Sequence, residues 1–449
     1  MKPYAYLIGI SLTAAMGGLM FGFDLGVVTG AIPFVQKQFD LNNFSLGFVV
    51  AIFEIGCMLG TLVAGGIADK IGRKKSLVIV ALSFIITTIG IFLADSVVDF
   101  STWRLLQGVG VGAASVLSPL YIAEVSPAAD RGKLVSMNQL TIILGIFLAS
   151  VVSYYYGRGG ELSSWRWMFG FALVPSMLFL LLVFFLPETP RWLVKRGRNE
   201  NAAFVLNRIS RSGNVQSEID SIKSSLQHFS EGKYRDLVSK KVFPVLLVAV
   251  SIAVLQQLCG SNNITPYMQI IFEQANIRLD EGLFNAVLVS GVFLIFTVFS
   301  MLLIDRVGRR KLMLLGFALM GFFLLALAFL FMQDTVQSTL ILISLGGFIA
   351  VYAFTLGPVT WVLLSELFPN TVRSKALSVS AAALWLACFV VVLVSPYLMS
   401  LDISVNFFIF ACFNLIGFFF TKLYVPETKG KTLEQISQAF TNKEPALVR

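Results

Sequence analysis

The stretch Gly17-Gly-Leu-Met-Phe-Gly-Phe-Asp-Leu-Gly-Val-Val-Thr-Gly30 lies inside an apolar run that extends from about Tyr4 to Pro33. A helix that spans a bilayer needs roughly 20 mainly apolar residues, so this run is long enough to cross a membrane. Asp24 stands near its middle, where a carboxylate costs on the order of 3 kcal/mol or more. Such a group is kept where it pairs with a cation or takes part in function.

The composition indicates that the whole chain is a membrane protein. Of its 449 residues, 57% are hydrophobic and only 13% are charged, about half the charged fraction of a typical soluble protein. We therefore expect an all-α integral membrane protein with twelve transmembrane helices. The twelve apolar segments cover residues 5–33, 45–68, 76–94, 100–124, 133–157, 165–186, 242–272, 281–304, 312–332, 337–366, 374–400 and 404–425.

The net charge of +9 follows from the membrane topology. Most of the 34 Lys and Arg residues lie in the tails and in the segments that follow the even-numbered spans. This positive-inside asymmetry predicts a multi-pass protein of the cell inner (plasma) membrane with both termini in the cytoplasm. The basic excess therefore implies no nucleic-acid partner. The first run is too long for a signal peptide, and we expect it to be retained as a helix.

Three motifs recur in the same order in the two halves of the chain, at almost one offset. Asp69 and Asp305 are 236 residues apart, and each stands four residues before an arginine, Arg73 or Arg309. The other repeated motifs are Glu124 with Arg131 and Glu366 with Arg373, 242 residues apart, and Pro187-Glu-Thr189 and Pro426-Glu-Thr428, 239 residues apart. The recurrence indicates a duplicated six-helix unit, the construction of secondary transporters that bind substrate between their halves.

The repeat predicts four regions. Residues 1–187 form an N-terminal six-helix bundle, and residues 242–425 form a pseudo-symmetric C-terminal bundle. Residues 188–241, the only extended polar stretch, form a cytoplasmic helical linker, and residues 426–449 form a cytoplasmic tail.

The repeated acids stand at the inner ends of helices, beside arginines that can donate hydrogen bonds to them. Such pairs can latch the inner ends of the two halves in one state and release them in another. The alternative is that the charges set the topology and cap helices. The predicted latch residues are Asp69, Arg73, Glu124, Arg131, Asp305, Arg309, Glu366 and Arg373.

Few ionisable groups remain at membrane depth: Asp24, Glu54 and Arg104. Asp24 and Arg104 reach comparable depths, since helix 1 runs outward and Arg104 lies near the outer start of helix 4. A nearby cation favours the ionised carboxylate, whereas isolation in an apolar region favours the protonated form. A pair that forms in one conformation and separates in the other makes Asp24 a proton switch. The alternative is a static salt bridge, and Glu54 is either a second titratable site or faces a water-filled seam.

The densest group of polar residues lies in the seventh span, Gln256-Gln-Leu-Cys-Gly-Ser-Asn-Asn-Ile-Thr-Pro-Tyr267. Gly260 and Pro266 predict an interrupted helix, which a membrane protein tolerates where the backbone lines a cavity or is buried in protein. Amides donate and accept hydrogen bonds at once, which suits a neutral polyhydroxyl ligand. The alternative is that they hold helices together. Gln139, Gly357-Pro358, Trp361 and Trp385 add amides and aromatic faces to the candidate site.

Over essentially its whole length the chain resembles the sugar porter family of the major facilitator superfamily. The motifs that carry the resemblance are Asp69-Lys-Ile-Gly-Arg-Lys-Lys75, Pro187-Glu-Thr-Pro-Arg-Trp192, Gln256-Gln-Leu-Cys-Gly-Ser-Asn262, Gly357-Pro-Val-Thr-Trp361 and Pro426-Glu-Thr-Lys-Gly430. Leu117-Ser-Pro-Leu-Tyr-Ile-Ala-Glu124 and Leu363-Leu-Ser-Glu-Leu-Phe-Pro-Asn370 are most similar to the bacterial D-xylose/proton and related monosaccharide/proton symporters.

The resemblance implies the major facilitator fold and assigns roles. Proton-coupled members carry an acid at the position of Asp24, where facilitators commonly have Asn, and Arg104 is the implied counter-ion. The implied sugar-binding residues are Phe21, Gln139, Gln256, Gln257, Asn262, Gly357, Trp361 and Trp385. The chain departs from its relatives at Pro266, Phe293, Ala353 and Leu384, so the identity of the sugar stays open.

These observations predict a proton-coupled symporter that imports a monosaccharide, a pentose or hexose such as xylose, glucose or galactose, by alternating access. The alternatives are a proton-coupled polyol or myo-inositol transporter, an uncoupled sugar facilitator and, less favoured, a non-transporting sugar sensor. No nucleophile–base arrangement or metal-ligand spacing supports an enzyme, a cofactor or a metal site. The expected partners are the sugar, the proton and the lipid bilayer, and we expect the protein to function as a monomer.

Overall fold

The computed structural model describes residues 3–127, 130–209, 215–228, 234–239, 242–333, 337–368 and 372–429. All regular elements in these residues are helical. Within these ranges, twelve helices or helix pairs are long and apolar enough to span a membrane. They agree with the twelve predicted segments to within a few residues, except where the seventh span is broken.

The N-terminal half is built from α1 to α7. Its helices are α1 (Pro3–Gln38), α2 (Asn43–Ile71), α3 (Arg73–Leu93), α4 (Val97–Val125), α5 (Arg131–Gly157), α6 (Ser164–Gly170) and α7 (Leu173–Val183), the last two sharing one span.

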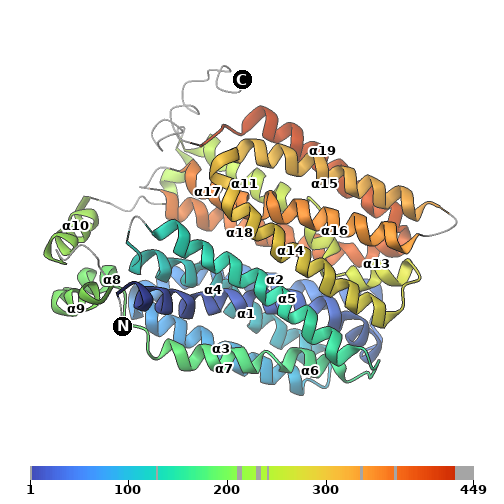
Figure 1. Ribbon diagram of the computed structural model, residues 1–449, viewed down its shortest axis with the longest axis horizontal. Coiled ribbons are helices and arrows are strands. Elements are labelled where there is room, and N and C mark those ends of the chain that lie inside the picture. Colours follow the sequence, from blue (N-terminus) through green and yellow to red (C-terminus); the bar gives the residue numbers. More distant parts are fainter. Residues whose placement is uncertain are drawn as a thin grey trace.

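Short helices follow α7 and connect the halves. They are α8 (Pro190–Lys195), α9 (Asn199–Ile209), α10 (Val215–His228) and the 3₁₀ turn η1 (Tyr234–Val238). The helices α8, α9 and α10 lie beyond one end of the bundle, near the start of α1 (Figure 1), whereas η1 contacts α11 and α18. We call this end of the molecule the linker end and the opposite end the far end. The limits drawn at residues 187/188 and 241/242 stay a prediction, and residues 430–449 of the predicted tail lie outside the described residues.

The C-terminal half is built from α11 to α19. Its helices are α11 (Phe243–Gln257), α12 (Ser261–Ile264), α13 (Met268–Gln274), α14 (Leu279–Val307), α15 (Arg309–Phe331), α16 (Ser338–Phe354), α17 (Leu356–Leu367), α18 (Arg373–Leu401) and α19 (Ile403–Tyr424).

The two halves lie against each other along their length, the first coloured blue to green and the second yellow to red in Figure 1. The contact between them is made mainly by α2 on α18 and by α5 on α14. Towards the far end the approach is close, because Gly47 leaves room on α2 for the carbonyl oxygen of Leu393. There Thr29 also donates a hydrogen bond to the carbonyl oxygen of Thr265 at 2.8 Å, and Tyr154 packs on Phe284.

Small residues set the packing of α2 on α4. A Cβ at Gly56 or Gly60 of α2 would overlap backbone carbonyl oxygens of α4, and one at Gly108 or Gly112 of α4 would overlap those of α2. Small residues let membrane helices approach until their backbones touch. The glycine run in α4 is therefore a packing seam, and it fixes where α2 and α4 place their polar side chains.

Candidate functional site

The interruption of the seventh span is confirmed. The helix α11 ends at Gln257, and Gly260 follows with a φ of +99°, a left-handed conformation that favours glycine. The chain then re-forms the short α12. Asn414 of α19 donates to the carbonyl oxygen of Cys259 at 2.8 Å, which satisfies a backbone group that the break exposes.

The break places three amide side chains in one hydrogen-bonded row. Asn262 donates to Gln257, and Gln257 donates to Gln256 at 2.8 Å. Gln256 then donates to the hydroxyl oxygen of Tyr352 on α16 at 2.8 Å. Gln256 and Gln257 are buried, with exposed fractions of 3% and 5%. Because amides can exchange these bonds for bonds to hydroxyl groups, the row is suited to a polyhydroxyl ligand.

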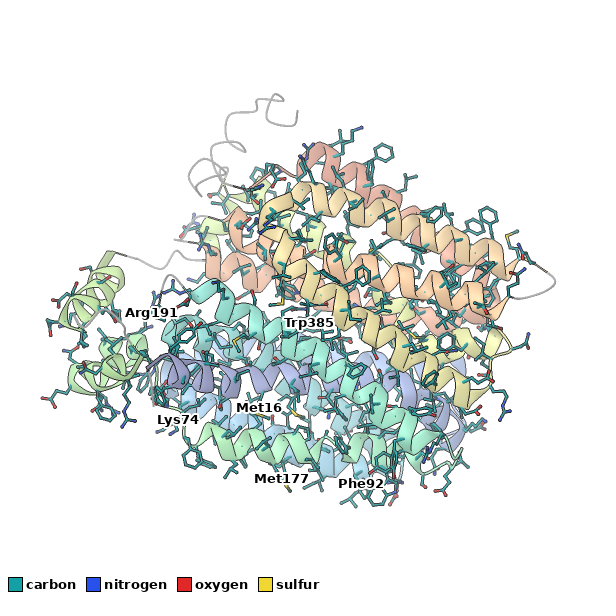
Figure 2. The ribbon with its side chains drawn as sticks, in the orientation of Figure 1. Met16, Lys74, Phe92, Met177, Arg191 and Trp385 are labelled. Atoms are coloured by element: carbon teal, nitrogen blue, oxygen red, sulfur yellow. The ribbon has the colours of Figure 1, made fainter. Side chains whose placement is uncertain are left out.

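Aromatic side chains meet where the two halves face each other. Phe21 of α1 and Trp385 of α18 have ring centroids 5.9 Å apart, across the boundary between the halves. Figure 2 shows Trp385 near the middle of the molecule. The indole nitrogen of Trp385 is buried and has no hydrogen-bond partner among the described residues, so it is available as a donor.

Among the described residues, three further predicted sugar-site residues make no hydrogen bond with the amide row. Gln139 is half-buried on α5, and Gly357 is the second residue of α17, directly after the break at Thr355. Trp361 of α17 is 42% exposed, so its ring is not covered by protein.

Asp24 lies fully buried in α1, and neither of its carboxylate oxygens has a hydrogen-bond partner among the described residues. Arg104 of α4 is 2% exposed and donates from Nη1 to Gln107 at 2.7 Å. Its guanidinium also lies 4.2 Å from the ring centroid of Phe53. Asp24 and Arg104 are not hydrogen-bonded to each other here, although Arg104 acts electrostatically on Asp24.

Arg104 acts on a second buried carboxyl group in the same way, Glu54 of α2. Glu54 is 5% exposed, and its Oε2 atom has no hydrogen-bond partner among the described residues. The thiol of Cys388 on α18 lies beside the same carboxyl group. The sequence identified Glu54 but gave no sign of its partner, since Cys388 reads as a small apolar residue of a span.

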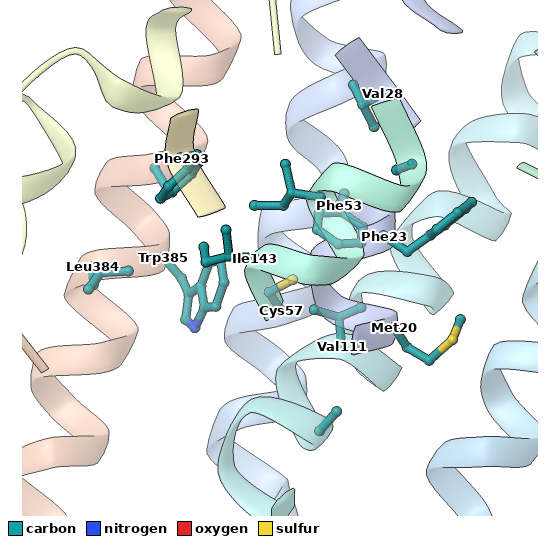
Figure 3. Packing of buried hydrophobic residues seen from close by; sticks show 14 of the residues in the cluster. Met20, Phe23, Val28, Phe53, Cys57, Val111, Ile143, Phe293, Leu384 and Trp385 are labelled. Atoms are coloured by element: carbon teal, nitrogen blue, oxygen red, sulfur yellow. The ribbon is translucent and has the colours of Figure 1, made fainter. Parts of the chain in front are cut away.

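Two residues that depart from the family pattern shape the C-terminal side of this region. Phe293 of α14 packs edge-on against Tyr352, with ring centroids 5.9 Å apart, where relatives often offer an amide. Leu384 precedes Trp385 and is buried. Figure 3 shows Phe293, Leu384 and Trp385 among the residues of this packed core. The sequence missed Tyr352 as a site residue, because a tyrosine in an apolar span carries no signal until its neighbours are known.

At the linker end of the N-terminal half, a first linker-end cluster surrounds Arg73. Arg73 pairs with Asp69 at 2.8 Å and with Glu124 at 2.9 Å. Glu124 also accepts a bond from Thr189 at 2.6 Å, and Glu188 accepts one from the backbone N–H of Arg73 at 2.9 Å. This network ties the ends of α2, α3 and α4 to the Pro187-Glu-Thr189 motif.

A second linker-end cluster repeats this pattern in the C-terminal half. Arg309 pairs with Glu366 at 3.0 Å, and Glu366 accepts a bond from Thr428 at 2.6 Å. Glu427 accepts one from the backbone N–H of Arg309 at 3.0 Å. Gly72 and Gly308, which precede the two arginines, have φ values of +102° and +103°.

The seven-residue spacing does not decide the pairing of the other two arginines. Arg131 is exposed at the start of α5, and Glu124 pairs with Arg73 instead. Arg373 donates to the carbonyl oxygen of Phe368 at 3.2 Å, so it caps the end of α17. The side chain of Asp305 lies outside the described residues.

In the two linker-end clusters, Glu188 has a carboxyl group whose pKa is shifted by its surroundings. Burial raises the pKa of its carboxyl group above the usual 4.5, while hydrogen bonds from the backbone N–H groups of Thr189, Lys74 and Arg73 oppose that change.

The described residues hold no group of three or more His, Cys, Asp or Glu side chains arranged to bind a metal ion.

A family model described as "Sugar (and other) transporter" matches residues 10–440. The chain belongs to this family. It is similar to the D-xylose-proton symporter of Escherichia coli (strain K12), with 35% identity over 96% of this chain and 95% of that protein. It is also similar to the arabinose-proton symporter of Bacillus subtilis (strain 168), with 34% identity over 96% of this chain and 95% of that protein.

The fold agrees with a solved structure of the same family. The inward open conformation of the xylose transporter XylE from E. coli matches 97% of this chain and 100% of that chain, with 33% identity and a TM-score of 0.86. The protein is thus a multi-pass sugar transporter of the major facilitator superfamily, and it is not an enzyme. The central site and the linker-end clusters described above are therefore parts of a sugar transporter.

Proposed function

We propose that this sugar transporter imports a monosaccharide together with a proton, by alternating access across the inner (plasma) membrane, with both termini in the cytoplasm. The observation that carries the proposal is the placement of Asp24. Its carboxyl group is fully buried, and it lies on the same helix as Phe21, one turn away, which faces Trp385 across the halves. A proton site and a ligand site are therefore supported by one short segment.

Protonation of Asp24 is the step that couples proton movement to sugar. A buried carboxylate without a hydrogen-bond partner is costly, and neutralising it or pairing it with Arg104 removes that cost. In this structure Arg104 bonds to Gln107 rather than to Asp24. The arrangement corresponds to the part of the cycle in which the pair is separated, and pairing in the other conformation returns the proton.

The sugar is held between the halves, mainly by the amide row. Gln256, Gln257 and Asn262 offer donors and acceptors from the C-terminal half, and Trp385 offers an aromatic face and a free N–H. Phe21, Gln139, Gly357 and Trp361 complete the proposed site. Because Phe293 is apolar, the selection among sugars depends on the amides and on the shape of the aromatic wall.

The alternating movement is a rocking of one half against the other. The two halves touch towards the far end through Thr29 and Thr265, while the described ion pairs at the linker end lie within single halves. We propose that the linker-end clusters act as latches. The linker ends of the two halves are held together in one state and separate in the other. The latch residues are those predicted from the sequence, and five of them make the described ion pairs: Asp69, Arg73, Glu124, Arg309 and Glu366.

Transport by purified protein in liposomes tests the function. With an acidic exterior and alkaline interior, we expect labelled D-xylose, D-glucose, L-arabinose or D-galactose to accumulate above its external concentration, and a protonophore to abolish the accumulation. Liposomes without protein are the control. Equilibration without accumulation would indicate an uncoupled facilitator, and uptake of myo-inositol alone would indicate a polyol transporter. Binding without any transport would indicate a sensor.

We propose that the protein functions as a monomer, because each six-helix half packs against the other half of the same chain. Static light scattering of the detergent-solubilised protein, corrected for bound detergent, measures the mass of the protein. A mass of two chains that persists on dilution would contradict a functional monomer.

A further inference from the structure

Glu54 occupies a position that the symporter mechanism proposed above does not use. It lies on α2 of the N-terminal half, on the helix that packs against α18 of the C-terminal half. The carboxyl group is 5% exposed and has an unpartnered Oε2 atom. A buried carboxyl on the moving contact between the halves changes its surroundings whenever the halves rock.

The charges at this place do not balance without a proton. Arg104 acts electrostatically on both Asp24 and Glu54. The acidic and basic side chains buried in the described membrane-spanning core are those of Asp24, Glu54 and Arg104. One guanidinium cannot neutralise two carboxylates, so the group of three is neutral only when one carboxyl holds a proton.

The other titratable groups around Glu54 do not supply a second positive charge. They are Cys57 on α2 itself, Cys388 on α18 and Tyr267 before α13, all buried. The helix α3, which also packs on α2, has its charged residues Arg73, Lys74 and Lys75 at the linker end. Arg104 is therefore the cation that serves both carboxyl groups.

Cys388 joins Glu54 to the sugar site. Asn262 donates from Nδ2 to the sulfur of Cys388 at 3.2 Å, and the carboxyl group of Glu54 lies beside the same thiol. Since Asn262 already donates to Cys388, the S–H of Cys388 is free to donate to the carboxylate. Polar contacts thus connect Glu54 through Cys388 and Asn262 to the amide row.

We propose that Glu54 is a second protonation site of the transport cycle, which shares one proton with Asp24 over Arg104 and senses the sugar through Cys388 and Asn262. When Asp24 takes the proton, ionised Glu54 becomes the counter-ion of Arg104, so the guanidinium is never left without a negative partner. When a sugar hydroxyl takes the Asn262 amide, the Asn262–Cys388 bond weakens and the hydrogen bond that supports the Glu54 carboxylate weakens with it. This proposal rests on the proposed proton-coupled function.

A spectroscopic test needs no sugar. Infrared spectra of the purified protein near neutral pH should show the C=O stretch of a buried protonated carboxyl group in the wild type, and the spectra of E54Q should lack it, because Asp24 alone then stays ionised beside Arg104. Equal bands in the two proteins would overturn the proposal. This result decides on Glu54 even if the protein transports none of the sugars tested.

A transport test measures the coupling. In E54Q, protonation of Asp24 leaves Arg104 without a counter-ion, so we expect the pH of half-maximal D-xylose or D-glucose uptake to move at least one unit to the acid side, which is a tenfold higher proton concentration. E54D, which keeps the carboxyl group, should recover at least half of that shift. An E54Q profile superimposed on that of the wild type would overturn the proposal, because a merely structural role lowers uptake without moving the profile.

Cys388 supplies a matched pair of variants. In C388A we expect sugar-induced proton uptake, followed with a pH indicator in weakly buffered solution, to fall at least twofold, and in C388S the hydroxyl donor should restore it. C412A is the control, because Cys412 is exposed on α19. Wild-type proton uptake in C388A would overturn the role of the thiol. If wild-type protein accumulates no sugar at all, the proposed function fails, while the infrared comparison still shows whether Glu54 takes up a proton.

Discussion

The two halves of this transporter are alike at the linker end and unlike at the centre. At the linker end Arg73 with Glu124 and Arg309 with Glu366 form the same bonds, each beside a glycine of positive φ. At the centre, the N-terminal half contributes the buried charged groups, whereas the C-terminal half contributes the amide row and, in its described residues, no fully buried charged side chain.

This difference indicates a division of labour within a duplicated scaffold. The shared linker-end clusters hold the helices of each half in one rigid body. The proposed function assigns the handling of the proton to Asp24, Glu54 and Arg104 of the first half, and it assigns the binding of the sugar mainly to the second half. The two ligands then influence each other only where the halves meet, so variants in the two halves should have different signatures.

The largest effect is expected for D24N, on the proton side of the comparison. An amide at this position cannot exchange a proton, so accumulation of sugar driven by a pH gradient should fall to the level of equilibration. Counterflow exchange of the same sugar, which needs no net proton movement, should persist. The measurement is labelled sugar in proteoliposomes under each condition.

D24E, which keeps a titratable group, is the matched control and should retain part of the accumulation. If D24N still concentrates sugar above the external level, Asp24 is not the coupling group. The assignment of proton coupling to the N-terminal half is then wrong.

On the sugar side, Q257A should weaken binding in every assay. Its amide links Asn262 to Gln256 here and, in the proposed site, exchanges these two bonds for bonds to sugar hydroxyls. Each hydrogen bond to the sugar that is lost costs about 1–1.5 kcal/mol, so a loss of two corresponds to roughly 30- to 150-fold in affinity. Counterflow and accumulation should fall together, unlike in D24N.

Tryptophan fluorescence titration with the transported sugar measures the affinity directly. T13A changes a partly buried residue of α1 outside the amide row and serves as the control. A Q257A protein that loses accumulation but keeps its affinity would contradict the assignment of sugar binding to the C-terminal half.

The two linker-end clusters differ in how deeply their ion pairs are buried. The side chains of Arg73 and Glu124 are 8% and 6% exposed, whereas those of Arg309 and Glu366 are 12% and 26% exposed. Breaking a buried ion pair costs about 3–5 kcal/mol, and exposure reduces this cost. R73A should therefore lower the Tm of the solubilised protein more than R309A does.

Both variants are measured in the same detergent, with R131A as the control because Arg131 is exposed. Equal Tm values for R73A and R309A would show that the two clusters contribute alike despite their different burial. Such a result would extend the similarity of the halves from their bonds to their energetics.

The smallest effect concerns Glu188 and pH. Its folded-state pKa is raised by burial above the usual 4.5, so the folded protein binds this proton more tightly than the unfolded chain does. The stability that this carboxyl contributes is fully present below about pH 4.5 and is lost as the pH rises through the folded-state pKa. The wild-type Tm should therefore decline relative to that of E188Q over that interval.

The comparison is made by melting the wild type and E188Q across a pH series, with E427Q measured in parallel as the symmetry-related substitution. A constant Tm difference between the wild type and E188Q at all pH values would contradict the burial of the charged form as the cause.

The sequence by itself determined the features that depend on composition and local chain geometry. Helical membrane spans follow from hydropathy, because a long apolar segment can cross a bilayer when its own helix satisfies every backbone N–H and C=O group. The break near Gly260 follows from the conformational preferences of glycine and proline, and the duplicated motifs follow from their spacing. These are local properties, so they could be predicted before any contact was known.

Only the tertiary structure decided which side chains meet. Residue spacing suggested Arg131 as a partner of Glu124, but the packing of α2, α3 and α4 brings Arg73 to it instead. Likewise Cys388 and Tyr352 gained roles only because α18 and α16 place them beside Glu54, Asn262 and Gln256. A hydrogen bond depends on atoms within a few ångströms of each other, and that proximity is set by how helices far apart in the chain pack together.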